Sequence, residues 1–244
     1  MKNLKEYIVE GIFDTDEDTI DESIKDQIKR FLNDNFDGAS SCKISRKPNA
    51  DGKYEVSSSK NIEVKNKKIT SLTNGMFIWV KVSGCFSCWE CRSLTTLKGA
   101  PEYVGGYFDC SDCDSLTSLE GAPEKVSGYF DCGYCTSLTS LEGAPKEVGG
   151  DFSCGYCTSL TSLEGAPKKV GGMFNCSRCT SLISLEGAPR EVGGDFKCWC
   201  CHSLTSLKGA PKEVGGDFSC DNCRVAFTID DVKKVSNVKG RIEV

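Results

Sequence analysis

The 244-residue sequence predicts a β-rich repeat solenoid, with a parallel sheet along one face and a small α/β cap at its N-terminal end. The first observation is a 22-residue repeat in which seven cysteines are each followed, three positions later, by a second cysteine. The second is that every unit has fixed apolar positions between glycine-rich corners. Such a unit cannot bury its apolar face alone and must stack on its neighbours. The first cysteines of the units are Cys88, Cys110, Cys132, Cys154, Cys176, Cys198 and Cys220.

Composition and charge exclude several classes of protein. The formal net charge is −5, so nothing points to the basic surface that nucleic-acid binding requires. The longest apolar run, residues 76–80, is far shorter than the roughly 20 residues that span a bilayer. The N-terminus lacks the hydrophobic region of a secretory signal. We therefore expect neither nucleic acid nor a membrane as partner, and we place the chain inside a cell or a virion.

The first eleven residues, MKNLKEYIVEG, contain a motif of their own. They resemble the capsid-targeting peptides of T-even bacteriophage internal head proteins, which a prohead protease cuts after Ile or Leu, any residue and Glu. The resemblance implies a bacteriophage protein of the host cytoplasm or virion interior. It also implies a targeting peptide over residues 1–10, with cleavage between Glu10 and Gly11. An ordinary short helix with one apolar face is the alternative explanation of these residues.

Residues 11–60 do not repeat and are predicted to form the N-terminal cap. An acidic stretch over residues 14–26 is typical of a solvated segment. Apolar residues at helical spacing predict an amphipathic helix over residues 22–36, which packs against the first coil or binds a partner. The turn sequence Asn-Ala-Asp-Gly at residues 49–52 predicts a hairpin over residues 43–57.

Each coil of residues 61–244 is predicted to contain one short strand. In the unit at residues 148–170, Phe152 and Cys154 alternate with small or polar residues, which is the period-two pattern of a strand with one face inward. Leu160, Leu163 and Val170 supply further inward positions. Weaker copies at residues 62–72 and 238–244 indicate terminal coils, which makes about nine coils in all.

The segment F-x-C-x-x-C-x-S-L-T-S-L of each unit resembles the leucine-rich repeats, in particular the bacterial surface-protein type. The resemblance covers roughly residues 60–244. It implies a right-handed solenoid with a parallel sheet on one side and irregular turns on the other. It implies no particular activity.

The chemistry of the cysteines has three interpretations. We favour packing, because valine fills the first cysteine slot in both terminal coils and buried free cysteine behaves as a small hydrophobe. Thiols of the second column would then contact backbone groups inside a turn. Redox chemistry is the weakest interpretation, because burial raises a thiol pKa; Cys85 and Cys200, in variable outward slots, would be the reactive exceptions. The third is a zinc site with the ligands Cys110, Cys113, Cys132 and Cys135.

No set of residues in the sequence suggests catalysis. The sole histidine, His202, lies in a slot that threonine fills in other units. Asp109 and Asp131 are one coil apart and similar acids recur in other coils, so they indicate a surface rather than a glycosidase pair. We therefore predict that the chain is not an enzyme and binds no cofactor.

The outward side of the strands varies from coil to coil although the inward columns are nearly constant, so the fold does not demand these residues. Exposed tyrosine and tryptophan are favoured at interfaces, and solenoids commonly bind on the sheet face. We hypothesise a non-enzymatic protein that binds a host or viral protein of basic character; neutral surface variation is the alternative for the face. The predicted face comprises Tyr107, Asp109, Tyr129, Asp131, Tyr134, Asp151, Tyr156 and Trp199.

Two further expectations concern assembly. The chain is expected to be a monomer or a dimer through its last coil, at Ile242 and Val244, because exposed terminal strands invite pairing. The alternative function is a zinc-stabilised structural array, or a component of the virion such as an internal head protein.

Overall fold

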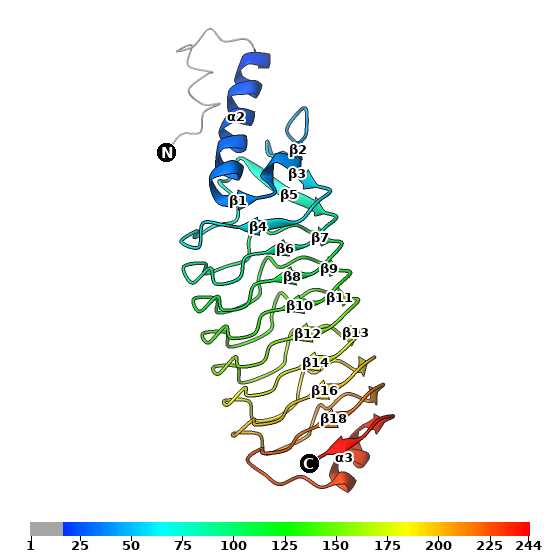
Figure 1. The fold of residues 1–244 in the computed structure, drawn as a ribbon. Helices are drawn as coiled ribbons and strands as arrows, with labels where there is room; N and C mark the ends of the chain where they lie inside the picture. The colour runs from blue at the N-terminus through cyan, green and yellow to red at the C-terminus, as the bar shows by residue number, and fades with distance from the viewer. Residues whose placement is uncertain (1–16) are drawn as a thin grey trace.

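The computed structural model describes residues 17–244, with side chains described from Asp21 onward. The predicted targeting peptide over residues 1–10 and the cut between Glu10 and Gly11 lie outside the described residues. The coils stack along one axis from helix α2 (Glu17–Asn35) to helix α3 (Ile229–Val235), as Figure 1 shows. Two ten-stranded sheets run along this axis, and we call them sheet A and sheet B.

The N-terminal cap closes both sheets with antiparallel strands. Strand β1 (Phe36–Asp37) follows α2 and pairs antiparallel with β4 (Ile62–Val64), which closes sheet A. After the 3₁₀ turn η1 (Ala39–Ser41), β2 (Cys42–Ile44) pairs antiparallel with β3 (Tyr54–Ser58), which closes sheet B. Ile28 and Leu32 of α2 are buried against the first coils. The predicted helix and hairpin are therefore confirmed, and the helix begins earlier than expected.

Sheet A contains the strand that the repeat predicts in each coil. Its strands from β4 onward are parallel and in register, so that phenylalanine lies beside phenylalanine. From Phe86 to Phe218, the ring centroids of neighbouring coils are 5.1 to 5.6 Å apart. The remaining strands are β6 (Phe86–Ser87), β8 (Phe108–Asp109), β10 (Phe130–Asp131), β12 (Phe152–Ser153), β14 (Phe174–Asn175), β16 (Phe196–Lys197), β18 (Phe218–Ser219) and β20 (Ile242–Glu243).

Sheet B occupies the side where irregular turns were expected, and that expectation is wrong. The valine that follows the Gly-Ala-Pro corner is buried in each coil and pairs with its equivalents in parallel register. These strands are only two residues long apart from β5, so they have no alternating pattern that a sequence could reveal. They are β5 (Phe77–Val82), β7 (Tyr103–Val104), β9 (Lys125–Val126), β11 (Glu147–Val148), β13 (Lys169–Val170), β15 (Glu191–Val192), β17 (Glu213–Val214) and β19 (Asn237–Val238).

The corners explain the glycine pairs between the two sheets. A Cβ on Gly171 would collide with the carbonyl oxygen of Gly149 in the preceding coil. At the other end of the solenoid, α3 replaces the leucine-rich segment of the last coil. Its capping box joins Thr228 and Asp231, and Val232 is buried against the core. The predicted terminal coils, and with them the solenoid of about nine coils, are confirmed.

Candidate functional site

The candidate site is the outer face of sheet A, which consists of the outward side chains of its strands and of the residues that flank them. At the start of two strands, the rings of Tyr107 and Tyr129 stack with centroids 4.6 Å apart. Tyr129 is 40% exposed. Partial burial and the neighbouring phenol and carboxylates raise the pKa of Tyr129 to about 12. The hydroxyl therefore stays protonated at neutral pH and can donate a hydrogen bond to a partner.

A turn with unusual backbone geometry follows the strand. In each of the seven full coils, the residue two positions after the first cysteine has a φ between 53° and 63°. Residues other than glycine seldom adopt this left-handed region. Hydrogen bonds between coils hold the turn: the amides of Tyr134 and Tyr156 each donate over 2.9 Å to a carbonyl of the next coil. The residues at this position are Glu90, Asp112, Tyr134, Tyr156, Arg178, Cys200 and Asn222.

This turn places side chains of successive coils in one stack, which we call the stacked column: Tyr134, Tyr156, Arg178 and Trp199. The two tyrosine centroids are 4.3 Å apart. The Arg178 guanidinium lies 5.1 Å from the Tyr156 centroid and 4.8 Å from that of Trp199. Tyr134 and Arg178 are exposed, so the stack presents a phenol ring and a guanidinium to solvent.

The three aspartates of the predicted face make hydrogen bonds within the repeat. Asp109 Oδ1 accepts from the Ser111 amide over 3.0 Å, and Asp131 Oδ1 accepts from the Gly133 amide over 2.8 Å. Burial raises the pKa of Asp131. Asp151 Oδ1 accepts from an amide of the following coil. Each carboxylate therefore stabilises the backbone as well as adding negative charge to the face, a role that the sequence analysis did not recognise.

The position after the first cysteine holds glycine in two middle coils and tryptophan, Trp89 or Trp199, in two others. Gly133 and Gly155 are buried there, and a Cβ on Gly155 would lie 3.0 Å from Asn175 Nδ2. Trp89 lies in the same position of an earlier coil, where its indole nitrogen donates to Glu63 Oε1 over 3.2 Å. The predicted aromatic residues therefore form two stacks, Tyr107 with Tyr129 and Tyr134 with Tyr156, and Arg178 joins Trp199 to the second stack.

Arg178 belongs to the stacked column but was not among the residues predicted from the sequence. A signal was present, because Arg178 follows Tyr156 by one repeat period and must occupy the same position in the next coil. In the sequence, a cation at that position interrupts the column of aromatic residues spaced one repeat period apart. In the structure, Arg178 continues the stack, because a guanidinium stacks on an aromatic face.

The two cysteine columns line the interior rather than a site. Thirteen of the fourteen repeated thiols are buried, and Cys223 is half-buried. In the second column, Cys135 Sγ donates to the Cys110 carbonyl of the preceding coil over 3.2 Å. In the first column, Cys132 Sγ donates to the Ser153 carbonyl of the following coil over 3.3 Å. The predicted contacts of thiols with backbone groups are confirmed, and the burial of both columns supports the packing role.

The zinc alternative places Cys110, Cys113, Cys132 and Cys135 around one ion. Within the part of the chain that the structure describes, no three Cys, His, Asp or Glu side chains are grouped so that they could hold a metal ion. Burial raises the pKa of Cys110 and Cys132 well above the usual value of a thiol. Metal binding would require these thiols to ionise.

The expected exposure of Cys200 is wrong. This residue is only 8% exposed, and its sulfur accepts a hydrogen bond from Asn222 Nδ2 over 2.9 Å. Both residues occupy the left-handed position of the turn in neighbouring coils, which brings their side chains together. Cys85, the other expected exception, is half-buried.

Comparisons with protein-family models, curated proteins and solved structures found nothing that matches this chain. Neither α2 nor α3, the helices of residues 17–244, has the length and apolar character needed to cross a bilayer.

Proposed function

We propose that the chain is a non-enzymatic repeat protein that binds another protein through the outer face of sheet A. The observation that supports this proposal most directly is the stacked column, in which Tyr134 is 47% exposed although its inward neighbours Cys132 and Cys135 are fully buried. Tyrosine, tryptophan and arginine are the side chains that contribute most binding energy at protein interfaces. The carboxylates of Asp109 and Asp131 beside them favour a partner of basic character.

Comparative capture from host lysate tests the proposal. We expect the Tyr129→Lys and Tyr134→Lys double variant to lose a protein that the unchanged chain retains, because both changes remove an exposed ring and add a positive charge that repels a basic partner. The matched control is Tyr103→Lys on sheet B, where the tyrosine hydroxyl lies 3.0 Å from Ser127 Oγ. Capture that survives the double variant, or that the control abolishes equally, contradicts the proposed face.

The origin of the protein is a separate part of the proposal. The repeat pattern supports a leucine-rich-type repeat protein, and the N-terminal peptide supports a bacteriophage protein of the host cytoplasm or virion interior. Mass spectrometry of purified virions is expected to find a chain that begins at Gly11. A chain with intact Met1, or the absence of the chain from virions, contradicts its packaging and cleavage in the virion.

For the assembly we propose a monomer or a dimer through the last coil, where Val244 is 46% exposed. Light scattering distinguishes a mass of 26.5 kDa from twice that value. If a dimer is found, Val244→Asp is expected to convert it to a monomer, and a dimer that persists contradicts the last coil as its interface.

A further inference from the structure

A line of cations lies beside sheet B in the C-terminal half of the solenoid. It is formed by the residue immediately before each of three neighbouring strands, β13, β15 and β17. These residues are Lys168, Arg190 and Lys212, and all three are exposed. The Arg190 amide donates to the Lys168 carbonyl over 2.9 Å, and the Lys212 amide donates to the Arg190 carbonyl over 2.8 Å. Their backbones therefore have the spacing of paired strands, about 4.8 Å.

The fold does not require cations in this line. Glu102 and Glu124 occupy the same position in two earlier coils, before β7 and β9. Lys146, in the coil that follows them, pairs with Glu124 over 3.2 Å. Like charges directly opposite each other on neighbouring strands are destabilising. Three consecutive cations therefore cost the free chain stability, and a bound anion would restore it.

The charges of the three cations are not neutralised by ion pairs. Among residues 21–244, whose side chains the structure describes, no acid lies within ion-pair distance of any of them. The acids of the neighbouring column have other partners. Glu191 pairs with Lys169 over 2.8 Å, and Glu213 accepts from Asn237 Nδ2 over 2.8 Å. The line therefore keeps its positive charge for a ligand.

Helix α3 adds a fourth cation at the end of the line. Lys233 is exposed and lines the same hollow of about 540 Å³ as Lys212. The next residue, Lys234, also lines it but pairs with Asp231 over 3.0 Å. The line and the helix together therefore present four cations that a ligand can contact.

The composition and shape of the line indicate the kind of ligand. It contains none of the aromatic anchors that are typical of protein interfaces. It is one residue wide and runs beside Glu191 and Glu213, so it suits a single linear polyanion better than a membrane surface or a duplex. Lysine and arginine contact the phosphates of nucleic acids, and such contacts position a strand without reading its bases.

We propose that Lys168, Arg190, Lys212 and Lys233 bind the phosphate backbone of single-stranded nucleic acid without sequence preference. The net charge of −5 led to the opposite expectation. At an ionic strength of about 0.15 M, however, charges more than about 8 Å apart are largely screened, so the local charge decides binding. The line is separate from the outer face of sheet A, so this proposal does not depend on the function proposed above.

Fluorescence polarisation of a short labelled thymidylate oligonucleotide with the full chain tests the proposal. We expect saturable binding at low salt. The logarithm of the association constant is expected to fall with the logarithm of the salt concentration with a slope of about −3, since each of four phosphate contacts to a single strand contributes about −0.7. An oligonucleotide of the same length with an uncharged methylphosphonate backbone is expected to bind at least tenfold more weakly.

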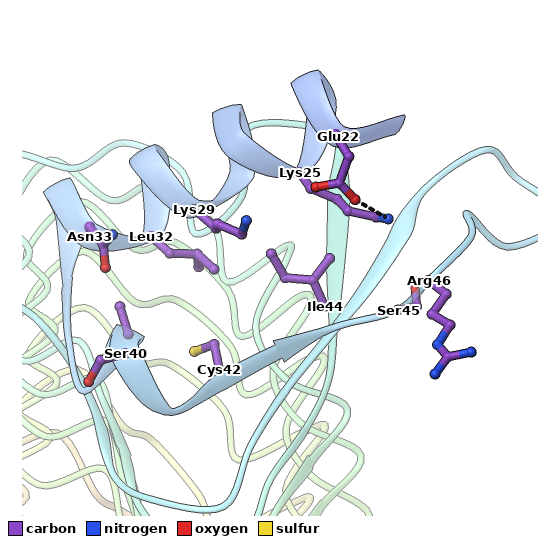
Figure 2. A pocket seen from close by; sticks show the side chains of 11 residues that line it. Glu22, Lys25, Lys29, Leu32, Asn33, Ser40, Cys42, Ile44, Ser45 and Arg46 are labelled. Atoms are coloured by element: carbon purple, nitrogen blue, oxygen red, sulfur yellow. Dashed lines mark hydrogen bonds and ion pairs between the residues drawn. The ribbon is translucent and has the colours of Figure 1, made fainter. Parts of the chain in front are cut away.

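A double charge reversal locates the contact. Arg190→Glu with Lys212→Glu is expected to weaken binding at least tenfold, and the fold accepts glutamate at this position, as Glu102 shows. The matched control, Arg46→Glu with Lys47→Glu, makes the same change of charge in the hairpin and is expected to stay within twofold. Both control residues are exposed, and the Arg46 side chain extends away from helix α2 (Figure 2).

Four outcomes overturn the proposal. The oligonucleotide does not bind, the uncharged backbone binds equally well, or the two double variants weaken binding equally. The fourth is an oligoglutamate of the same charge that binds more tightly than the oligonucleotide, because the line would then fit an acidic protein.

Discussion

The inward columns and the outer face of sheet A belong to the same coils, yet the repeat constrains the identity of their residues differently. Inward, Phe152 and Cys154 stack on identical residues in the neighbouring coils, and every contact is buried. Outward, the stacked column joins tyrosine, arginine and tryptophan in only part of the coils. The repeat period therefore dictates stacking on both sides of the sheet, whereas burial dictates residue identity only on the inner side.

Raising the pH should destabilise the fold through its buried thiol columns, and this is the largest effect that we expect. The pKa of all seven first-column thiols is raised in the folded chain, mainly by hydrogen bonds with Cys113 and Cys179 for Cys88 and Cys154 and by burial for the other five. Unfolded thiols ionise near pH 8.5, so above that pH the unfolded state binds fewer protons and folding stability falls. Each thiol contributes about 1.4 kcal/mol per pH unit until its folded pKa is reached, which for Cys220 is about 12.

Urea denaturation at pH 8 and pH 10 measures this effect. We expect a much lower midpoint at pH 10, and equal midpoints would contradict the buried state of the thiols. Cys154→Val provides a control, because Val64 already fills the same position in the first coil. This variant is expected to reduce the pH dependence of folding stability by the contribution of one thiol.

Truncating one ring of the inner phenylalanine column should have the next largest effect. Phe152→Ala removes a fully buried ring between two stacked neighbours. We expect a loss of about 3–5 kcal/mol in the free energy of unfolding, measured by urea denaturation. Tyr134→Ala on the outer face is the comparison and is expected to cost much less. Similar losses for the two variants would remove the distinction between inner and outer columns.

At the left-handed turn of the outer face, two substitutions distinguish the effect of backbone strain from the effect of losing the side chain. Tyr156 has a φ of 63°, which glycine adopts without strain. We expect Tyr156→Gly to be more stable than Tyr156→Ala by about 1 kcal/mol, because only alanine retains the strain. Both variants should lose partner capture to the same extent. A more stable alanine variant in thermal denaturation would contradict the strain assigned to this turn.

Removing metal should have the smallest effect. If the thiols only pack, dialysis against EDTA leaves the thermal midpoint unchanged, and elemental analysis finds far less than one zinc per chain. Zinc at about three per chain, with a midpoint that falls on chelation, would instead favour the structural array with ligands such as Cys110 and Cys132.

Much of the fold could be predicted, because the inward positions repeat with one period. The spacing of Cys88 and its six equivalents predicts the number of coils, and alternation around Phe152 predicts which residues point inward. The short strands of sheet B could not be predicted in this way, since each has one buried valine and no alternation. The hairpin was predictable because its turn sequence at residues 49–52 is local.

The candidate site was only partly predictable. The columns that contain Tyr107 and Tyr134 follow from the period, because equal spacing places residues side by side. The positive φ at Tyr156 and the bond from the Met173 amide to Asp151 do not, since they depend on how closely neighbouring coils approach. The burial of Cys200 has the same cause.

The sequence by itself determined the solenoid, its coils and its two thiol columns, because an apolar pattern of fixed period can be buried only by stacking copies of the unit. Tertiary structure alone decided that a second sheet forms, that Arg178 continues an aromatic stack, and which cations beside sheet B form ion pairs. These features arise where separate segments meet in space, and the distances between them are set by packing rather than by the order of residues along the chain.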